Sequence, residues 1–151
     1  MIISFCGHSN FQKSKEYEKK ILIILQNTVG DNHVDFYLGG YGAFDDFAYE
    51  CCKKYRETHP LVTLIFVTPY ITPEYQKNHL QNEKNRYDNI LYPNIESKPP
   101  RFAITYRNKW MVEQSDYVIC AIDHHWGGAF KTYQYALQKK KIIFNIFEGE
   151  I

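Results

Sequence analysis

Three glycine-containing clusters in this sequence could bind an anion. They are Gly7-His8-Ser9, Gly39-Gly40-Tyr41-Gly42 and Gly127-Gly128, and each follows a short apolar run. Glycine lets an anion approach the backbone N–H groups, while a following helix directs its positive end at the charge. The two Gly-Gly pairs together predict a phosphate or carboxylate site, although a tight turn explains either pair taken alone. Neither pair fits the dinucleotide or Walker A pattern, so no cofactor is predicted.

Charged and aromatic side chains lie close to these clusters in the sequence. Asp45 falls in the first helical turn after Gly42, where it could hold a ribose hydroxyl or simply complement the helix dipole. Arg107 could make a bidentate contact to a phosphate or carboxylate, the alternative being a solvated surface arginine. Three aromatic residues could stack on a base: Tyr41, Tyr70 and Trp126.

A metal site is conceivable at Asp123-His124-His125 but is not predicted. Neighbouring residues rarely direct both side chains to one ion, and no third His or Cys has a supporting spacing. The four cysteines form no CxxC pair and are expected to be reduced and buried.

The elements that must position these residues alternate between strand and helix. Apolar runs predict strands at 1–6, 34–38, 62–67, 117–122 and 142–147, and helical periodicity predicts helices at about 13–27, 44–55, 74–87 and 130–138. Crossovers of this length predict a Rossmann-like, doubly wound α/β fold with a mainly parallel sheet of about five strands flanked by helices. We expect one domain over 1–151, with an irregular edge excursion at 73–106.

In such a sheet, ligands bind outside the carboxyl ends of the strands. The glycine clusters, the turn at Thr68-Pro69-Tyr70 and the segment from Asp123 to Thr132 are therefore predicted to share one rim.

Composition limits the classes of partner. Eighteen Lys and Arg residues nearly cancel 17 Asp and Glu, and the formal charge of +1 indicates no global basic field. Nucleic acid is therefore not expected as the main partner. No apolar run approaches the length of about 20 residues that spans a bilayer, and the N-terminus has no charged region before its first strand. We expect a cytoplasmic protein without a membrane partner.

Four blocks in order along the chain resemble the SLOG superfamily, which includes the Smf/DprA and lonely-guy proteins. The likeness is greatest to its YspA-like bacterial branch, apart from Ser9, where that branch tends to have Arg. The blocks are Phe5-Cys6-Gly7-His8, Gly39-Gly40 with Phe44-Asp45, Arg107 to Val112 with Ser115-Asp116, and Gly127-Gly128 with Thr132 and Tyr135-Ala136.

The lonely-guy proteins are phosphoribohydrolases in which an Arg-containing segment precedes a PGGxGTxxE catalytic motif. Because Arg107 precedes Gly127-Gly128, that pair corresponds to the motif, and Gln134 stands at the Glu position. Gln cannot ionise and therefore cannot act as the catalytic carboxylate. N-glycosidic hydrolysis remains an alternative, with a carboxylate supplied by Asp45, Asp46 or Asp123.

The resemblance implies a sensor or regulatory domain that binds a nucleotide or nucleotide-derived small molecule, and a homodimer, as in many SLOG relatives. The alternatives are the hydrolase and a protein-binding scaffold without a small ligand. We predict ligand contacts, with no assigned catalytic residue, at Gly7, His8, Ser9, Gly39, Gly40, Tyr41, Gly42, Asp45, Arg107, Asp123, Gly127, Gly128 and Thr132.

Overall fold

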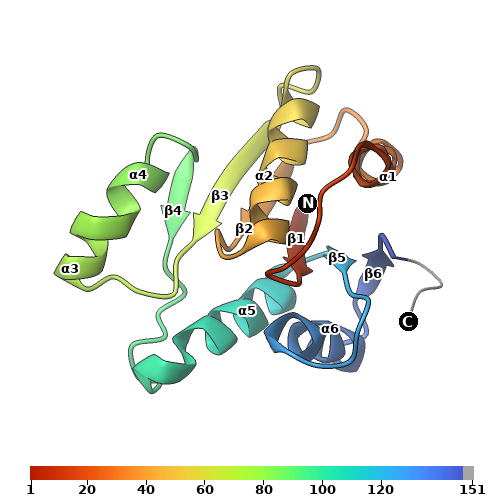
Figure 1. The fold of residues 1–151 in the computed structure, drawn as a ribbon. Helices are drawn as coiled ribbons and strands as arrows, with labels where there is room; N and C mark the ends of the chain where they lie inside the picture. Colours follow the sequence, from red (N-terminus) through yellow and green to blue (C-terminus); the bar gives the residue numbers. More distant parts are fainter. Residues whose placement is uncertain (148–151) are drawn as a thin grey trace.

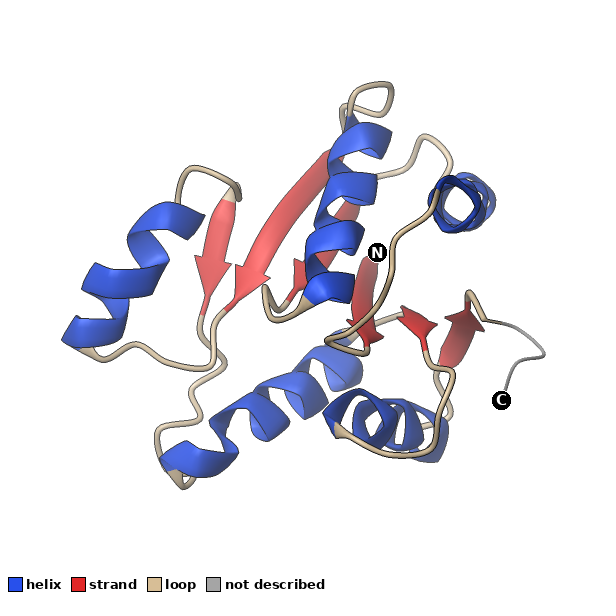
Figure 2. Cartoon of the chain, viewed as in Figure 1, coloured by secondary structure: helices blue, strands red, loops and turns tan. Residues whose placement is uncertain are grey.

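The computed structural model describes residues 1–147, which form a six-stranded sheet between two layers of helices (Figures 1 and 2). Every pair of neighbouring strands is parallel, and the strand order is β4-β3-β2-β1-β5-β6. The strands are β1 (Ile2–Gly7), β2 (Val34–Leu38), β3 (Val62–Val67), β4 (Asn89–Leu91), β5 (Tyr117–Ala121) and β6 (Ile142–Asn145). The predicted Rossmann-like α/β class is confirmed.

Alternate residues of each inner strand pack on opposite faces of the sheet, as the two-residue repeat of a strand requires. In β5, Ile119 and Ala121 join the core cluster on one face, whereas Val118 and Cys120 join the cluster on the other. Because both faces are covered, the inner strands are predominantly apolar.

The long helices divide between the two faces. Helices α1 (Lys15–Thr28) and α2 (Ala43–Arg56) cover one core, whereas α5 (Ala103–Gln114) and α6 (Gly128–Gln138) pack together on the other. Ser14 caps α1 by accepting a hydrogen bond from the Tyr17 N–H at 3.2 Å. Among the described residues, no helix is both long and apolar enough to cross a membrane.

The segment predicted as an irregular edge excursion, 73–106, is helical in the region where a helix was predicted, 74–87, and also contains a strand that was not predicted. One continuous helical stretch comprises α3 (Pro73–Tyr75), the π-helical η1 (Gln76–Leu80) and α4 (Gln81–Glu83). The chain then adds β4 to the sheet edge beside β3, which raises the strand number from the predicted five to six (Figure 1). A 3₁₀ turn, η2 (Pro100–Phe102), leads into α5.

Candidate functional site

The topology of the sheet creates a crevice at the carboxyl end of β1. This strand pairs with β2 on one side and with β5 on the other, so the loops after β1 and β5 leave the sheet towards opposite faces. A switch of this kind is where open α/β sheets bind ligands. The loop after β1 is held in place by backbone hydrogen bonds from Phe11 N–H to the His8 carbonyl and from Ala43 N–H to the Ser9 carbonyl, both at 3.1 Å.

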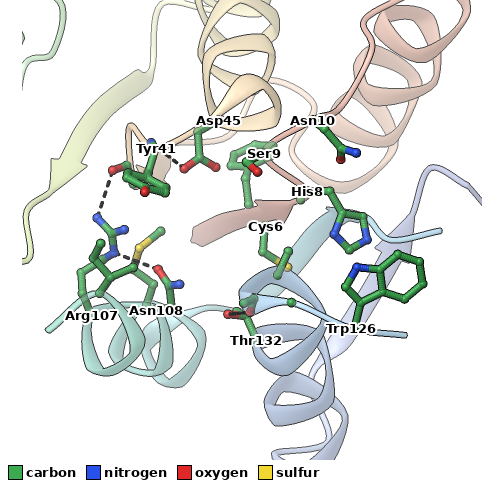
Figure 3. Close-up of a pocket in the computed structure, with 18 of the residues that line it drawn as sticks. Cys6, His8, Ser9, Asn10, Tyr41, Asp45, Arg107, Asn108, Trp126 and Thr132 are labelled. Carbon is green, nitrogen blue, oxygen red and sulfur yellow. Dashed lines mark hydrogen bonds between the residues drawn. The ribbon is translucent and has the colours of Figure 1, made fainter. Parts of the chain in front are cut away.

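A pocket of about 390 Å³ occupies this crevice (Figure 3). It brings together most of the residues selected from the sequence, from β1, the loop after β2, α5 and the start of α6. The predicted residues that line it are Gly7, His8, Ser9, Gly39, Tyr41, Asp45, Arg107, Gly127, Gly128 and Thr132.

Three predicted residues lie outside this lining. Gly40 lines a neighbouring pocket of about 280 Å³ that also contains Tyr70, and Asp123 lines a third, of about 450 Å³, beyond His8. Gly42 has a φ of +92° and packs against Ser9, so both its conformation and its close contact favour glycine.

The lining also contains residues that the sequence did not predict as ligand contacts, among them Asn10, Ile104, Asn108 and Met111. Three of these could have been found from helical spacing, because Arg107, Asn108 and Met111 lie three, four and seven residues after Ile104. Positions at this spacing share one face of α5. The irregular composition before residue 107 concealed that helix, which begins at Ala103.

The glycines of the pocket serve different purposes. A Cβ at Gly7 would lie 2.3 Å from the Phe44 ring, so close packing explains that glycine. Gly128 has no such explanation, because its φ is not positive and no atom lies within 4 Å of the Cβ position. It is the first residue of α6 and lines the pocket.

Arg107 is a buried cation that holds two strand ends. Its side chain is 1% exposed, and Nη1 donates hydrogen bonds to the carbonyls of Gly39, at 3.0 Å, and Val67, at 2.7 Å. Nε donates to Asn108 Oδ1 at 2.8 Å. Burial lowers the pKa of Arg107, while the nearby Asp45 acts in the opposite direction. Arg107 is therefore not a solvated surface arginine, and part of its donor fork is used inside the protein.

Asp45 places a carboxyl group in the pocket wall. It accepts a hydrogen bond from the Tyr41 N–H at 2.8 Å, which ties the loop after β2 to the first turn of α2. Burial raises the pKa of Asp45 to about 6, against the opposing effects of the Tyr41 N–H and Arg107. By contrast, Gln134 is exposed on α6 and is absent from the pocket lining.

His8, His124 and Asp123 form a cluster at the other end of the pocket. The His8 and His124 rings are stacked with 3.4 Å between centroids, and Asp123 Oδ1 lies 2.7 Å from His124 Nδ1 and 3.6 Å from His8 Nε2. The expectation of no metal site assumed that no third ligand lay nearby. The fold supplies His8, which is distant in the sequence.

Two exposed aromatic rings line the same pocket. Tyr41 is 64% exposed and Trp126 is 68% exposed. They lie at opposite ends of the pocket, Tyr41 near Arg107 and Trp126 beside His8 (Figure 3). Tyr70, the third predicted stacking residue, instead lines the neighbouring pocket and donates to the Pro100 carbonyl at 3.3 Å.

No protein-family model matches the sequence, and no curated protein matches it. A solved structure of DNA processing protein A from Helicobacter pylori, described for its single-stranded DNA binding mode, is similar in fold, with a TM-score of 0.63 and 17% sequence identity. The similarity covers 96% of this chain and 64% of that one. The chain thus spans less than two thirds of the protein that it matches.

This comparison overturns two expectations. We expected a small nucleotide-derived ligand, and we expected nucleic acid not to be the main partner; the protein similar in fold binds single-stranded DNA. The error was to read the net charge of +1 as an argument about one site, although it is a sum over the whole surface. The YspA-like resemblance stays a prediction. At this level of identity the likeness shows the fold alone, which is the Rossmann-like fold of DNA processing protein A.

Proposed function

We propose that this chain binds single-stranded nucleic acid in the pocket at the carboxyl end of β1. The observation that carries the proposal is that two exposed aromatic rings, Tyr41 and Trp126, line one pocket together with the open backbone of Gly127-Gly128. Aromatic faces stack on bases of any sequence, and a helix N-terminus offers N–H groups to a phosphate. The fold similarity to a single-stranded DNA-binding protein supports the same class of ligand.

The phosphate contact is assigned to the start of α6. Gly127 caps this helix without a side-chain hydrogen bond, and the first N–H groups of any helix lack a carbonyl partner within it. A side chain at Gly128 would occupy the space that an incoming phosphate needs. Lys131, exposed in the same first turn, adds positive charge. Arg107 adds buried positive charge at the far end of the pocket.

The bases are assigned to the two aromatic rings. Because Tyr41 and Trp126 lie at opposite ends of the pocket, a strand that crosses it can stack one base at each end and place its backbone between them (Figure 3). A duplex keeps its bases stacked inside and cannot make these contacts. We therefore assign the site to single strands.

We propose that residues 1–151 form one nucleic-acid-binding domain that works in the cytoplasm. Its four cysteines, Cys6, Cys51, Cys52 and Cys120, are free and buried, which suits a reducing compartment.

Fluorescence anisotropy with a labelled oligo-dT of about 16 nucleotides, long enough for one site of this kind, tests the proposal. Tyr41→Ala and Trp126→Ala should each weaken binding by about 1–3 kcal/mol, the usual contribution of one stacked base. Phe102→Ala is the matched control, because Phe102 is 43% exposed but does not line the pocket. Unlabelled duplex should compete poorly. Failure of the parent protein to bind, or equal binding by all three variants, would exclude the pocket as the site.

A further inference from the structure

The pairing of β1 with β5 brings His8 beside Asp123 and His124, which are more than 110 positions away in the sequence. Gly7 is in register with Ala121, so the residues that directly follow the two strands are neighbours at the carboxyl edge of the sheet. His8 and His124 both line the main pocket, and all three residues line the pocket beyond it.

His8 has a buried ring nitrogen without a hydrogen-bond partner. It is 6% exposed, and its Nε2 makes no hydrogen bond within the described part of the chain. Buried polar atoms are almost always paired, so one left unpaired inside a pocket wall points to a missing ligand. The lone Nε2 lies on the side of Asp123, whose Oδ1 is 3.6 Å away, too far for a hydrogen bond.

We propose that His8, Asp123 and His124 bind a divalent transition-metal ion of the Zn²⁺ class. Each residue offers one ligand atom, and these atoms all lie within 4.8 Å of one another. Two imidazole nitrogens and a carboxylate oxygen are ligands that Zn²⁺ and its first-row neighbours accept, and three protein ligands leave a coordination position open. Across residues 1–147 no other group of three His, Cys, Asp or Glu side chains meets this spacing.

Binding of an ion requires two changes at His124. A hydrogen bond 2.7 Å long joins His124 Nδ1 to Asp123 Oδ1. For Nδ1 to bind an ion, its proton must move to Nε2, so that the neutral ring presents a lone pair at Nδ1. The stacked His124 ring must also turn so that its nitrogen and that of His8 point to a common centre. Trp126, which covers His124 with 3.8 Å between ring centroids, is largely exposed and leaves room for this rotation.

The position of His8 supports the assignment. Its buried ring lines both pockets, so an ion that enters either one can reach the Nε2 atom that has no hydrogen bond. The pairs His33 with Asp35 and His59 with Asp31 each have only two such residues. They serve as internal comparisons for adventitious binding.

Isothermal titration of the tag-free, chelator-treated protein with Zn²⁺ tests the proposal. One ion should bind per chain, and His124→Ala and Asp123→Asn should each weaken that binding by roughly tenfold or more. His125→Ala is the matched control, because the neighbouring His125 ring packs on Phe130 instead of joining the cluster. Both ligand variants change partly exposed side chains, so the fold should survive them.

Trp fluorescence provides a second readout. Co²⁺ bound at this cluster should quench Trp126, which contacts His124, and the quenching should disappear in His124→Ala but persist in His125→Ala. Absence of stoichiometric Zn²⁺ binding, or equal binding by the ligand and control variants, would overturn the assignment. Neither measurement contains nucleic acid, so its outcome is independent of the proposed function.

Discussion

Replacing Arg107 by Ala should destabilise the whole domain, because this side chain joins α5 to the carboxyl ends of β2 and β3. Its Nη1 is the donor to the carbonyls that follow β2 and end β3, and the guanidinium is almost completely buried. The substitution leaves both carbonyls without this partner and opens a cavity between α5 and the sheet. It therefore removes bonding and packing at the same position.

The expected size follows from those two hydrogen bonds. Each bond from a charged donor contributes about 1.5–3 kcal/mol, and relief from burying the charge offsets part of the sum. We expect the free energy of unfolding to fall by about 2–4 kcal/mol. In a domain of this size that loss lowers the melting temperature by about 4–16 °C.

Urea unfolding followed by circular dichroism measures this change. Arg107→Met separates the two contributions, because it keeps most of the side-chain volume but leaves the carbonyls unpaired; it should lose nearly as much stability as Ala. Arg107→Lys should recover part of the loss. Arg101→Ala is the control, since Arg101 is exposed on the preceding turn, and it should stay within about 0.5 kcal/mol of the parent. An Arg107→Ala protein as stable as Arg101→Ala would refute the structural role.

Two other predictions concern the pocket. Oligonucleotide affinity should rise as the pH falls through about 6, the pKa of Asp45, because the carboxylate becomes neutral and stops repelling phosphate. In anisotropy titrations, Asp45→Asn should bind more tightly than the parent at pH 7.5, and its affinity should depend less on pH. If the affinity of Asp45→Asn depends on pH as strongly as that of the parent, Asp45 is not part of the site. Gly128→Ala should leave stability equal or higher, because its Cβ meets no atom and Ala favours helix, yet weaken oligonucleotide binding. Gly7→Ala should instead destabilise the fold, because the added Cβ would collide with Phe44. Thermal melts measure the effect of each substitution on stability, and anisotropy measures its effect on oligonucleotide binding. If both substitutions change stability and binding equally, the assignment of Gly128 to the phosphate site is wrong.

Elements whose side chains are buried on both faces could be predicted well from the sequence. The strands at 34–38 and 62–67 have the bounds predicted for them, because a buried parallel strand is a continuous apolar run. β4 was missed because three residues, two of them half-buried, carry too little pattern. The start of α6 at Gly128, two residues before the predicted 130, was missed because glycine is a poor helix former.

The candidate site could be predicted in part. The loops converge as expected because parallel strands end at a common edge, and this needs no knowledge of strand order. The cluster of His8 with His124 could not be foreseen, because it depends on β1 lying beside β5, a relation between residues more than 100 positions apart. The hydrogen bonds of Arg107 could not be predicted for the same reason, since the carbonyls that accept them lie at the ends of β2 and β3.

The central position of β1 also has a consequence for the way the chain folds. β1 is synthesised before the other strands of the sheet, but its partner β5 begins only at Tyr117, so the sheet around β1 stays incomplete until these residues have left the ribosome. Contacts between such distant segments slow folding. Until then the β1 edge is unpaired, and a nascent chain with a bare edge strand is prone to aggregate. Folding during translation should therefore proceed from the β1–β3 half, with the pocket assembled last.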